Sequence, residues 1–292
     1  MDYSLRELEC FIAVAEERSF TRAAKRLNLA QPPLSRHIRI LEEKIGAKLF
    51  NREPRGVSLT PAANVFYEET RNIPRRLLRA GEAARRSASG EIARLRLGFV
   101  SAVMNDELSD IFRTFRHQHP EIQITLHDVP PQEQLEAIAD GRLDGGFVGL
   151  EPPEPPAGIR FIPWRSEPLI CLMPTGHALA DRKSIRLEAL VDESFVAVSS
   201  ASAPAFAGLI QEMCQTAGFR PRIILESPRA QAVALMVGVG SGVALLPETL
   251  AGLVKRSTHA IPLRPARKIT HVFACRDRKM EGPLADLMSL LH

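Results

Sequence analysis

The chain has 292 residues, 45% of them hydrophobic, and a formal net charge of +4. This length predicts two or three compact units, and the apolar content is sufficient for well-packed cores. No apolar run reaches the roughly eighteen residues of a membrane helix, the N-terminus lacks a secretory-signal pattern, and the four cysteines are far apart. We therefore expect a cytoplasmic protein with reduced thiols, no metal site and no membrane contact.

The first sixty residues predict a small helical domain. Apolar residues at Leu5, Leu8, Ile12 and Ala15 indicate a first helix. Residues 19–52 then predict two short amphipathic helices joined by a tight turn at Asn28–Leu29, with Ser19 or Thr21 as the cap of the earlier helix. Ala30 precedes the later helix in a position where a capping serine is expected, which costs about 1 kcal/mol of local stability.

The later of these two helices has one apolar and one polar face. It opens with two prolines, which a first helical turn tolerates, and Leu34, Ile38, Leu41 and Ile45 recur at spacings of four, three and four. The side chains that we assign to DNA contact are Gln31, Pro32, Ser35, Arg36 and Arg39. In a major groove, Gln can pair with adenine, Arg with guanine, and hydroxyl groups with phosphates. The pattern predicts a helix-turn-helix reader of DNA.

Charge supports this interpretation. Between Arg18 and Arg55 there are ten Lys or Arg and three Glu, which gives +7 against +4 for the whole chain. A basic module on a slightly acidic remainder is typical of a protein that holds phosphates with one end only. The alternative, a solvated charged helix pair, does not explain this asymmetry. Residues 52–59 predict a hairpin with Gly56 at its turn, which would place Arg55 near the minor groove or a phosphate.

The N-terminal region resembles that of LysR-type transcriptional regulators. The matching stretches are Leu5–Phe11, Ser19–Ala24, Gln31–Ile38, Leu41–Glu43 and Leu49–Arg52, and weaker similarity continues to about residue 275. The resemblance implies a winged helix-turn-helix in 1–59, a linker helix and hinge in 60–90, and a two-lobed α/β effector-binding domain in 91–292. Lobe I would comprise 91–163 and 268–292, and lobe II 164–267. The implied partners are double-stranded promoter DNA, a small-molecule effector, further copies in a homodimer or dimer of dimers, and RNA polymerase, with no cofactor and no catalytic residue.

Residues 60–88 predict a long helix that starts with the cap and proline Thr60-Pro61. A lone helix with an apolar stripe has to bury that stripe, and the resemblance implies that a partner chain covers it. We therefore assign Phe66, Ile73 and Leu77 to dimerisation. Pro74 removes one helical hydrogen bond and predicts a kink near Glu69–Ile73.

Beyond the hinge, strand-like and helix-like segments alternate. The expected strands are 94–100, 122–126, 145–148, 169–173, 195–198 and 223–225, and residues 236–247 are expected to return towards the first lobe. Alternation of this kind predicts parallel sheets with helices on both faces. The resemblance implies two such lobes around a cleft, as in periplasmic binding proteins.

Ligands of open α/β sheets bind beyond the carboxyl ends of strands, where helix N-termini favour anions. The candidate effector contacts at such ends are Ser101, Ala102, Pro131, Ser202, Pro204 and Phe206. We expect the effector to be an organic anion. In relatives that sense aromatic acids a hydroxyl residue lies near position 131, so proline there disfavours that ligand class. The alternative is that these segments are ordinary strand-to-helix turns.

Three other features do not support a further function. The glycine run Gly238–Gly242 lacks the lysine and helix-opening pattern of a nucleotide site, and His117–His119 has no Cys or Asp nearby to share a metal. Cys214 has no partner nearby in the sequence, which disfavours a redox sensor. The remaining alternative to a transcription factor is a small-molecule-binding protein or enzyme with a vestigial helical N-terminus. Such a relic would have no reason to keep a polar face on 31–39.

Overall fold

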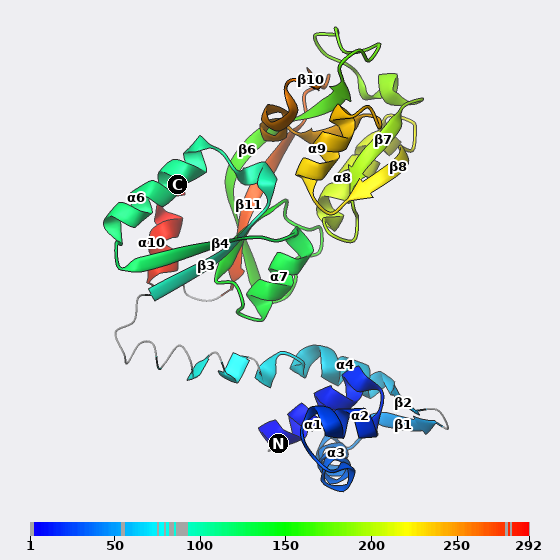
Figure 1. Ribbon diagram of the computed structural model, residues 1–292, viewed down its shortest axis with the longest axis vertical. Helices are drawn as coiled ribbons and strands as arrows, with labels where there is room; N and C mark the ends of the chain where they lie inside the picture. Colours follow the sequence, from blue (N-terminus) through cyan, green and yellow to red (C-terminus); the bar gives the residue numbers. More distant parts are fainter. Residues whose placement is uncertain are drawn as a thin grey trace. The chain divides into compact units, whose positions relative to one another are not determined.

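The computed structural model describes residues 3–53, 56–74, 76–78, 80–81, 85, 93–277, 280 and 282–291. The chain divides into two compact units, Met1–Glu91 and Ile92–His292 (Figure 1). Within the described residues, no helix is both long and apolar enough to cross a membrane.

The N-terminal unit is a winged helix-turn-helix. Its helices are α1 (Leu5–Glu17), α2 (Phe20–Arg26) and α3 (Gln31–Ile45), followed by the antiparallel hairpin β1 (Phe50–Glu53) and β2 (Gly56–Leu59). The core packs around the fully buried side chains of Phe11, Leu34, Leu41 and Leu49. Ser19, and not Thr21, caps α2 by accepting a hydrogen bond from Arg22 N, whereas Ala30 leaves α3 without a side-chain cap. Arg55 of the predicted wing lies outside the described residues.

Helix α4 (Pro61–Thr70) is shorter than the predicted linker helix. The helix is interrupted by a turn at Arg71 and Asn72, and helical residues resume at 73, which confirms the kink expected near Pro74. Proline has no N–H to bond to the carbonyl four residues earlier, so the regular ladder cannot continue through Thr70. Residues 82–84 and 86–90 of the predicted linker lie outside the described residues.

Phe66, which we assign to dimerisation, also contributes to the core of its own domain. Its ring lies 5.1 Å from the ring of Phe11 and 5.9 Å from that of Tyr3, measured between centroids, so Phe66 packs on the core of its own domain. The apolar stripe in the sequence did not reveal this, because α4 uses its first two turns to cover α1. Ile73 and Leu77 remain exposed, at 42% and 55%.

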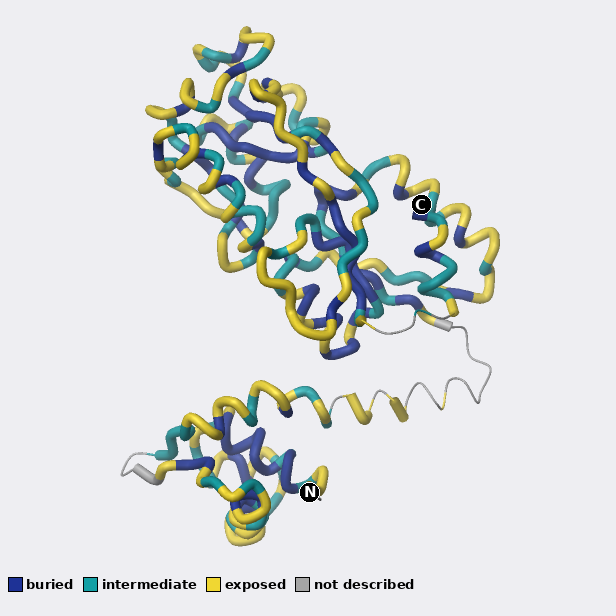
Figure 2. Tube along the Cα trace, turned by 180° about the vertical axis from the view of Figure 1, so that it is seen from behind, coloured by how far each residue is buried: buried dark blue, intermediate teal, exposed yellow. Residues whose placement is uncertain are grey.

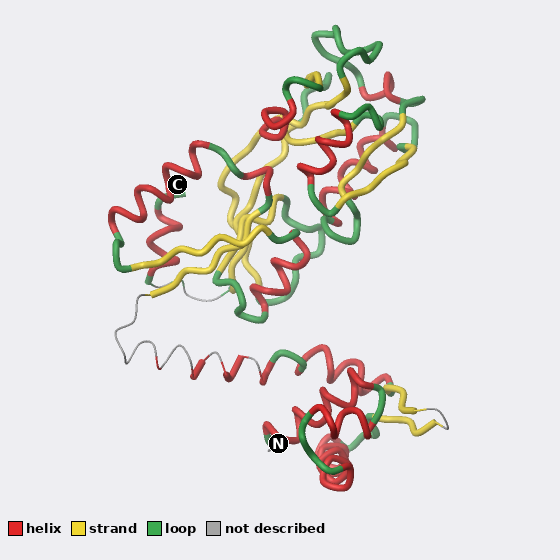
Figure 3. The backbone as a smooth tube through the Cα atoms, in the orientation of Figure 1, coloured by secondary structure: helices red, strands yellow, loops and turns green. Residues whose placement is uncertain are grey.

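The C-terminal unit contains a seven-stranded mixed sheet in the order β10-β6-β11-β5-β3-β4, with β9 paired to β6. Figure 3 shows the strands in yellow and the helices around them in red. Its strands are β3 (Ala93–Phe99), β4 (Ile122–Asp128), β5 (Gly145–Gly149), β6 (Ile159–Pro174), β9 (Ala244–Pro247), β10 (Thr258–Pro262) and β11 (Lys268–Arg276). A second, two-stranded sheet consists of β7 (Ser194–Val198) and β8 (Arg222–Ser227). The helical segments are η1 (Ser101–Val103), α6 (Asp106–Gln118), α7 (Pro131–Ala139), η2 (Leu187–Leu190), α8 (Pro204–Thr216), α9 (Ala230–Gly238), η3 (Glu248–Val254) and α10 (Pro283–Ser289).

Two lobes are built on this framework. We call the part built on β3, β4 and β5 with α6, α7 and α10 lobe I, and the part built on β7 to β10 with α8 and α9 lobe II. In lobe I, α6 and α10 cover one face of the sheet and α7 covers the other, as expected. The long strands β6 and β11 run through both lobes, and Figure 2 shows buried residues concentrated along the centre of the unit.

The alternation of strands and helices predicted parallel sheets, whereas the large sheet of the C-terminal unit is mixed. Pairing is parallel for β3 with β4 and β5, and for β7 with β8, but β6 pairs antiparallel with β9, β10 and β11. Residues 236–247 do not return to lobe I either. Strand β9 pairs with Leu169–Leu172 of β6, and β11 is the strand that returns. Two crossings between the lobes require two antiparallel strands, which local alternation cannot reveal.

Candidate DNA-binding surface and effector cavity

The polar face of α3 forms one continuous exposed surface. Gln31, Pro32, Arg36 and Arg39 are exposed and Ser35 is half-buried, while Leu34, Ile38 and Leu41 are buried beneath them. A groove beside the helix is lined by Pro32, Ser35, Arg36 and Arg39, together with Lys48 and Asn51 from the start of the hairpin. Helix and hairpin thus offer cations and amides to one groove, which suits a phosphate backbone with base edges beside it.

Glu42 fixes the hairpin to the end of α3. One carboxylate oxygen accepts hydrogen bonds from Leu49 N at 2.8 Å and Phe50 N at 3.4 Å, and the other accepts from Lys48 Nζ at 2.8 Å. Burial alone would raise the pKa of Glu42, but the hydrogen bonds from Lys48 and the two amides outweigh it and lower the pKa. Helical periodicity did not single out Glu42, because it treats a glutamate as a surface residue.

A cavity of about 90 Å³ lies between the lobes of the C-terminal unit. Since a single water molecule needs only about 10–15 Å³ of such space, the cavity can hold a small organic molecule. Five of the six predicted effector contacts line it: Ser101, Ala102, Pro131, Pro204 and Phe206. They come from the ends of β3, β4 and β7, because the carboxyl ends of these strands all point towards the cavity.

Ser202 is the exception. It does not line the cavity; instead, its carbonyl oxygen accepts a hydrogen bond from Gln132 N at 3.2 Å, which joins the lobe II loop to the first turn of α7. The amides of Ser202 and Ala203 both donate to Ser199 O, at 3.1 and 3.0 Å, and this turn places the Ser202 carbonyl towards lobe I. The residue therefore bridges the lobes through its backbone.

A second bridge between the lobes had no signal in the sequence. Arg229 Nη1 donates to Asp128 Oδ1 at 2.6 Å, and Arg229 Nη2 donates to the Asp128 carbonyl at 2.9 Å. Both residues line the cavity: Asp128 ends β4 of lobe I, and Arg229 directly precedes α9 of lobe II. They are 101 positions apart in the chain, so only the fold brings them together.

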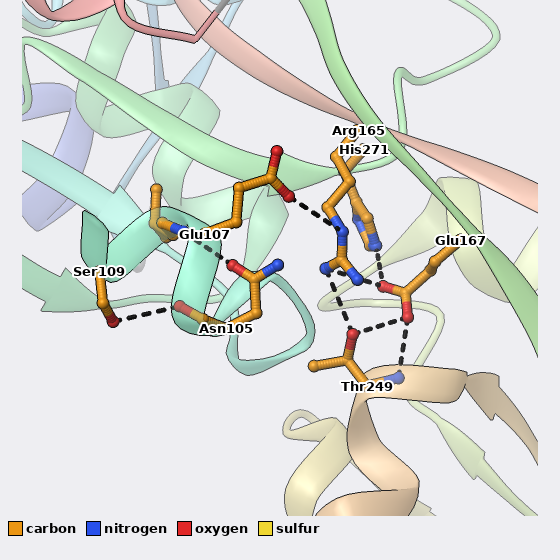
Figure 4. A network of polar contacts seen from close by, with 8 residues as sticks. Asn105, Glu107, Ser109, Arg165, Glu167, Thr249 and His271 are labelled. Atoms are coloured by element: carbon orange, nitrogen blue, oxygen red, sulfur yellow. Dashed lines mark hydrogen bonds and ion pairs between the residues drawn. The ribbon is translucent and has the colours of Figure 1, made fainter. Parts of the chain in front are cut away.

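A buried polar network lies beside the same cavity (Figure 4). Glu167 Oε2 accepts hydrogen bonds from Thr249 N at 2.8 Å and Thr249 Oγ1 at 2.7 Å, and Oε1 lies 2.5 Å from His271 Nε2. Burial alone would raise the pKa of Glu167, but the hydrogen bonds from His271 and Thr249 lower it overall. Arg165 completes the network, with Nη1 3.3 Å from Thr249 Oγ1 and Nε 3.7 Å from Glu107 of α6.

The position of α7 at the cavity depends on Gln134. Its side chain is fully buried, and Nε2 donates to Val129 O at 2.7 Å. The side chain occupies the space above Gly98 and Gly146, where an added Cβ would approach Gln134 Oε1 to 2.5 and 2.2 Å. Glycine at both strand positions is therefore required for α7 to lie against β3 and β5, and α7 carries Pro131 and Gln132 into the cavity wall.

Three helices begin at the cavity without a side-chain cap. They are α7 after Pro130, α8 after Ala203 and α9 after Arg229. Amides in a first helical turn have no acceptor within the helix, and the helix dipole makes such ends attractive to negative charge. The cavity therefore combines mostly apolar walls with donors that favour an anionic group.

Other features of the sequence do not form sites. Gly238 ends α9 and Gly242 precedes β9, so this glycine run does not open a helix. His119 lies 3.7 Å from Asp286 and 3.6 Å from Glu121, as a helix-terminal charge partner. Burial raises the pKa of Cys214 to about 11 and that of Cys171 further, which makes both thiols poor nucleophiles. Among the described residues, no group of three His, Cys, Asp or Glu could hold a metal ion.

Both units match known protein families. Residues 5–64 match the bacterial regulatory helix-turn-helix protein, lysR family, and residues 88–291 match the LysR substrate binding domain. The HTH-type transcriptional regulator AlsR of Bacillus subtilis is 36% identical over 84% of this chain and 80% of its own length. The HTH-type transcriptional regulator BenM of Acinetobacter baylyi is 32% identical over 92% of this chain and 88% of its own length.

Solved structures agree with the sequence relatives. Full-length CbnR in complex with its target DNA has a TM-score of 0.68 and 25% identity, with 100% of this chain and 99% of that chain covered. Full-length BenM has a TM-score of 0.58 and 30% identity over 99% and 95% of the two chains. Since these relatives are named transcriptional regulators, the prediction that the chain is not an enzyme is confirmed. The chain belongs to the LysR family of transcriptional regulators, with an N-terminal helix-turn-helix domain and a C-terminal effector-binding domain.

Proposed function

We propose that this regulator binds a two-fold promoter site through α3 of two copies and changes its DNA binding when a small organic anion enters the cavity between the lobes. The observation that carries the proposal is the cavity itself, whose walls come from both lobes and contain an arginine and three uncapped helix starts. The proposal places the protein in the cytoplasm, where promoter DNA is found.

The effector class follows from the polar groups of the cavity. Ser101 offers a hydroxyl at the end of β3, and the first turns of α8 and α9 offer amides to a carboxylate. The remaining walls contain Pro, Val, Leu, Ile and Phe side chains, which would surround an apolar carbon skeleton. Pro131 supplies no hydroxyl, so the carboxylate would depend on Ser101 and backbone amides.

Switching requires that the effector bind two arrangements of the protein with different affinity. The lobes are joined across the cavity by the Arg229–Asp128 pair and by the hydrogen bond from Gln132 to Ser202. An anion beside Arg229 would compete with Asp128 for the guanidinium group and so change how the lobes are held.

For assembly, the exposed Ile73 and Leu77 supply apolar surface that a second copy would cover, while Phe66 stabilises the DNA-binding domain.

One set of gel-shift experiments tests both DNA binding by α3 and effector binding in the cavity. Gel-shift titrations on DNA upstream of the protein's own gene are run with and without a panel of small carboxylic acids. Arg36→Ala should cost about 1–3 kcal/mol on the specific site. Arg6→Ala on α1, which removes the same charge from the same domain, should cost much less. Ser101→Ala should leave DNA binding without acids unchanged and weaken the response to acids.

Two outcomes would contradict the assignment. If Arg36→Ala bound the site as tightly as the parent protein, α3 would not be the recognition helix. If Ser101→Ala responded to the acids as the parent does, while Ser200→Ala in the exposed lobe II loop did not, the effector would lie elsewhere.

A further inference from the structure

A second, smaller cavity of about 20 Å³ lies in lobe II, next to the effector cavity. It is lined by α8 on one side and by the sheet of β7 and β8 on the other, with Phe195, Ile210 and Ile223 among its walls. This volume is room for about one water molecule. The walls are apolar except for Gln211 and Glu226, which are both exposed. The second cavity is therefore an apolar space that suits hydrocarbon better than water.

Phe206 lies at the boundary between the two cavities. Its half-buried side chain lines both, and it packs against the apolar cluster that contains Ala102 and against the one that contains Ile210. At the start of α8, Ala203, Phe206 and Ile210 are spaced by three and four residues, so they share one side of the helix. Ala203 lines the effector cavity and Ile210 the second cavity. Val198, the last residue of β7, lines both from the opposite wall.

We infer that Phe206 sets the maximum length of the effector, because its ring closes the effector cavity at a point where apolar space continues behind it. This inference rests on the proposed function, since it assumes a carboxylic acid in the effector cavity. An acid held by its carboxylate at Ser101 would extend its carbon skeleton as far as the Phe206 ring. A longer acid would have to displace that ring from two packed clusters, so the protein selects short acids by a steric barrier.

The test measures the binding of unbranched carboxylic acids, from acetate to octanoate, to the full-length protein by isothermal titration calorimetry. Each methylene group that enters an apolar cavity should raise the affinity about fourfold. In the parent protein this rise should end, and the affinity should fall, before octanoate is reached. In Phe206→Ala the rise should continue into the second cavity, so that the first acid too long for the parent protein binds about tenfold more tightly to the variant.

Two further variants sharpen this test. Phe219→Ala removes the same side chain from the same lobe, where its ring centroid lies 6.2 Å from that of Phe195, but Phe219 lines neither of the two cavities. It should keep the length limit of the parent protein, and an extended limit in Phe219→Ala would contradict the inference. Phe206→Leu retains an apolar side chain of smaller size, so it should extend the limit even where Phe206→Ala does not fold.

The outcomes separate this inference from the proposed function. If acids bind and the affinity of the parent protein rises without a break to octanoate, Phe206 is not a barrier, and the inference is refuted while the proposed function stands. If the parent protein shows a length limit that neither variant of Phe206 extends, another residue sets the limit and the inference is also refuted. If no acid binds to the parent protein or to the variants, the organic-anion cavity fails together with the inference.

Discussion

The DNA-binding surface and the effector cavity are built in opposite ways. The five candidate DNA contacts of α3 lie within a stretch of nine residues, from Gln31 to Arg39, and four of them are exposed. The cavity is lined by residues from Val100 to His271, contributed by strand ends and helix starts of both lobes. A surface made by one helix depends on local periodicity and a small core beneath it. A cavity made by converging segments depends on the topology of the whole domain.

The largest expected effect tests whether the two regions are stable independently of each other. Phe11 is fully buried, and its ring lies within 5.6 Å of the rings of Phe50 and Phe66. Phe11→Ala should destabilise the N-terminal unit by about 3–5 kcal/mol, because it removes an aromatic side chain from a small core. Hydrogen exchange should speed up in peptides from 5–59, with little change in 93–277. Leu5→Ala, on the exposed side of the same helix, serves as the control.

Equal acceleration of exchange in both units would show that they unfold together. In that case the DNA-binding surface and the effector cavity would differ in their geometry, but their stability would not be independent.

The second effect concerns the support of the cavity. In Gly146→Ala the new Cβ would lie 2.2 Å from Gln134 Oε1, so the Gln134 side chain must move. We expect a loss of about 3 kcal/mol in the C-terminal unit, at the upper end for overpacking, and weaker binding of acids because α7 carries Pro131 and Gln132. Thermal denaturation and calorimetric titration measure the two consequences.

A matched control and a rescue sharpen this test. Gly208→Ala, where an added Cβ meets nothing within 4 Å, should leave stability unchanged or raise it by up to about 1 kcal/mol. In the Gly146→Ala background, Gln134→Ala should cost less than it does alone, because the clash is already relieved. Strict additivity of the two substitutions would argue against a direct contact between residues 134 and 146.

The smallest effect is the pH dependence of the N-terminal unit. Burial alone would raise the pKa of Glu7 and Glu42, but Lys44 and Lys48 respectively hydrogen-bond the carboxylates and lower it below the usual 4.5. The ionised forms of these two glutamates are therefore favoured by folding. Their contribution to the free energy of unfolding is present above about pH 4.5 and is lost as the pH falls through the lowered pKa. Glu42→Gln should cost about 1.5 kcal/mol at pH 7, the value for one hydrogen bond to a charged group.

The stability of Glu42→Gln should therefore fall less steeply than that of the parent protein when the pH is lowered. Hydrogen exchange of peptides from 49–59, measured between pH 7 and pH 4, reports this region. Glu43→Gln, an exposed neighbour, is the control. A parent-like pH dependence in Glu42→Gln would mean that this carboxylate does not couple α3 to the hairpin.

The sequence by itself determined the elements and the surface of the DNA-binding domain. The spacing of Leu34, Ile38 and Leu41 fixes which side of α3 is buried, so the opposite side with Arg36 is exposed whatever the rest of the chain does. It also indicated five residues of the cavity wall, since strand ends followed by helix starts are recognisable as local patterns.

Only the tertiary structure decided the remainder. The packing of Phe66 depends on which surface α4 covers. The Arg229–Asp128 pair, the carbonyl bridge at Ser202 and the contact of His271 with Glu167 depend on strands that cross between the lobes. These contacts join segments up to about a hundred residues apart. Side-chain periodicity records which face of an element is buried, but it does not record which distant element covers that face.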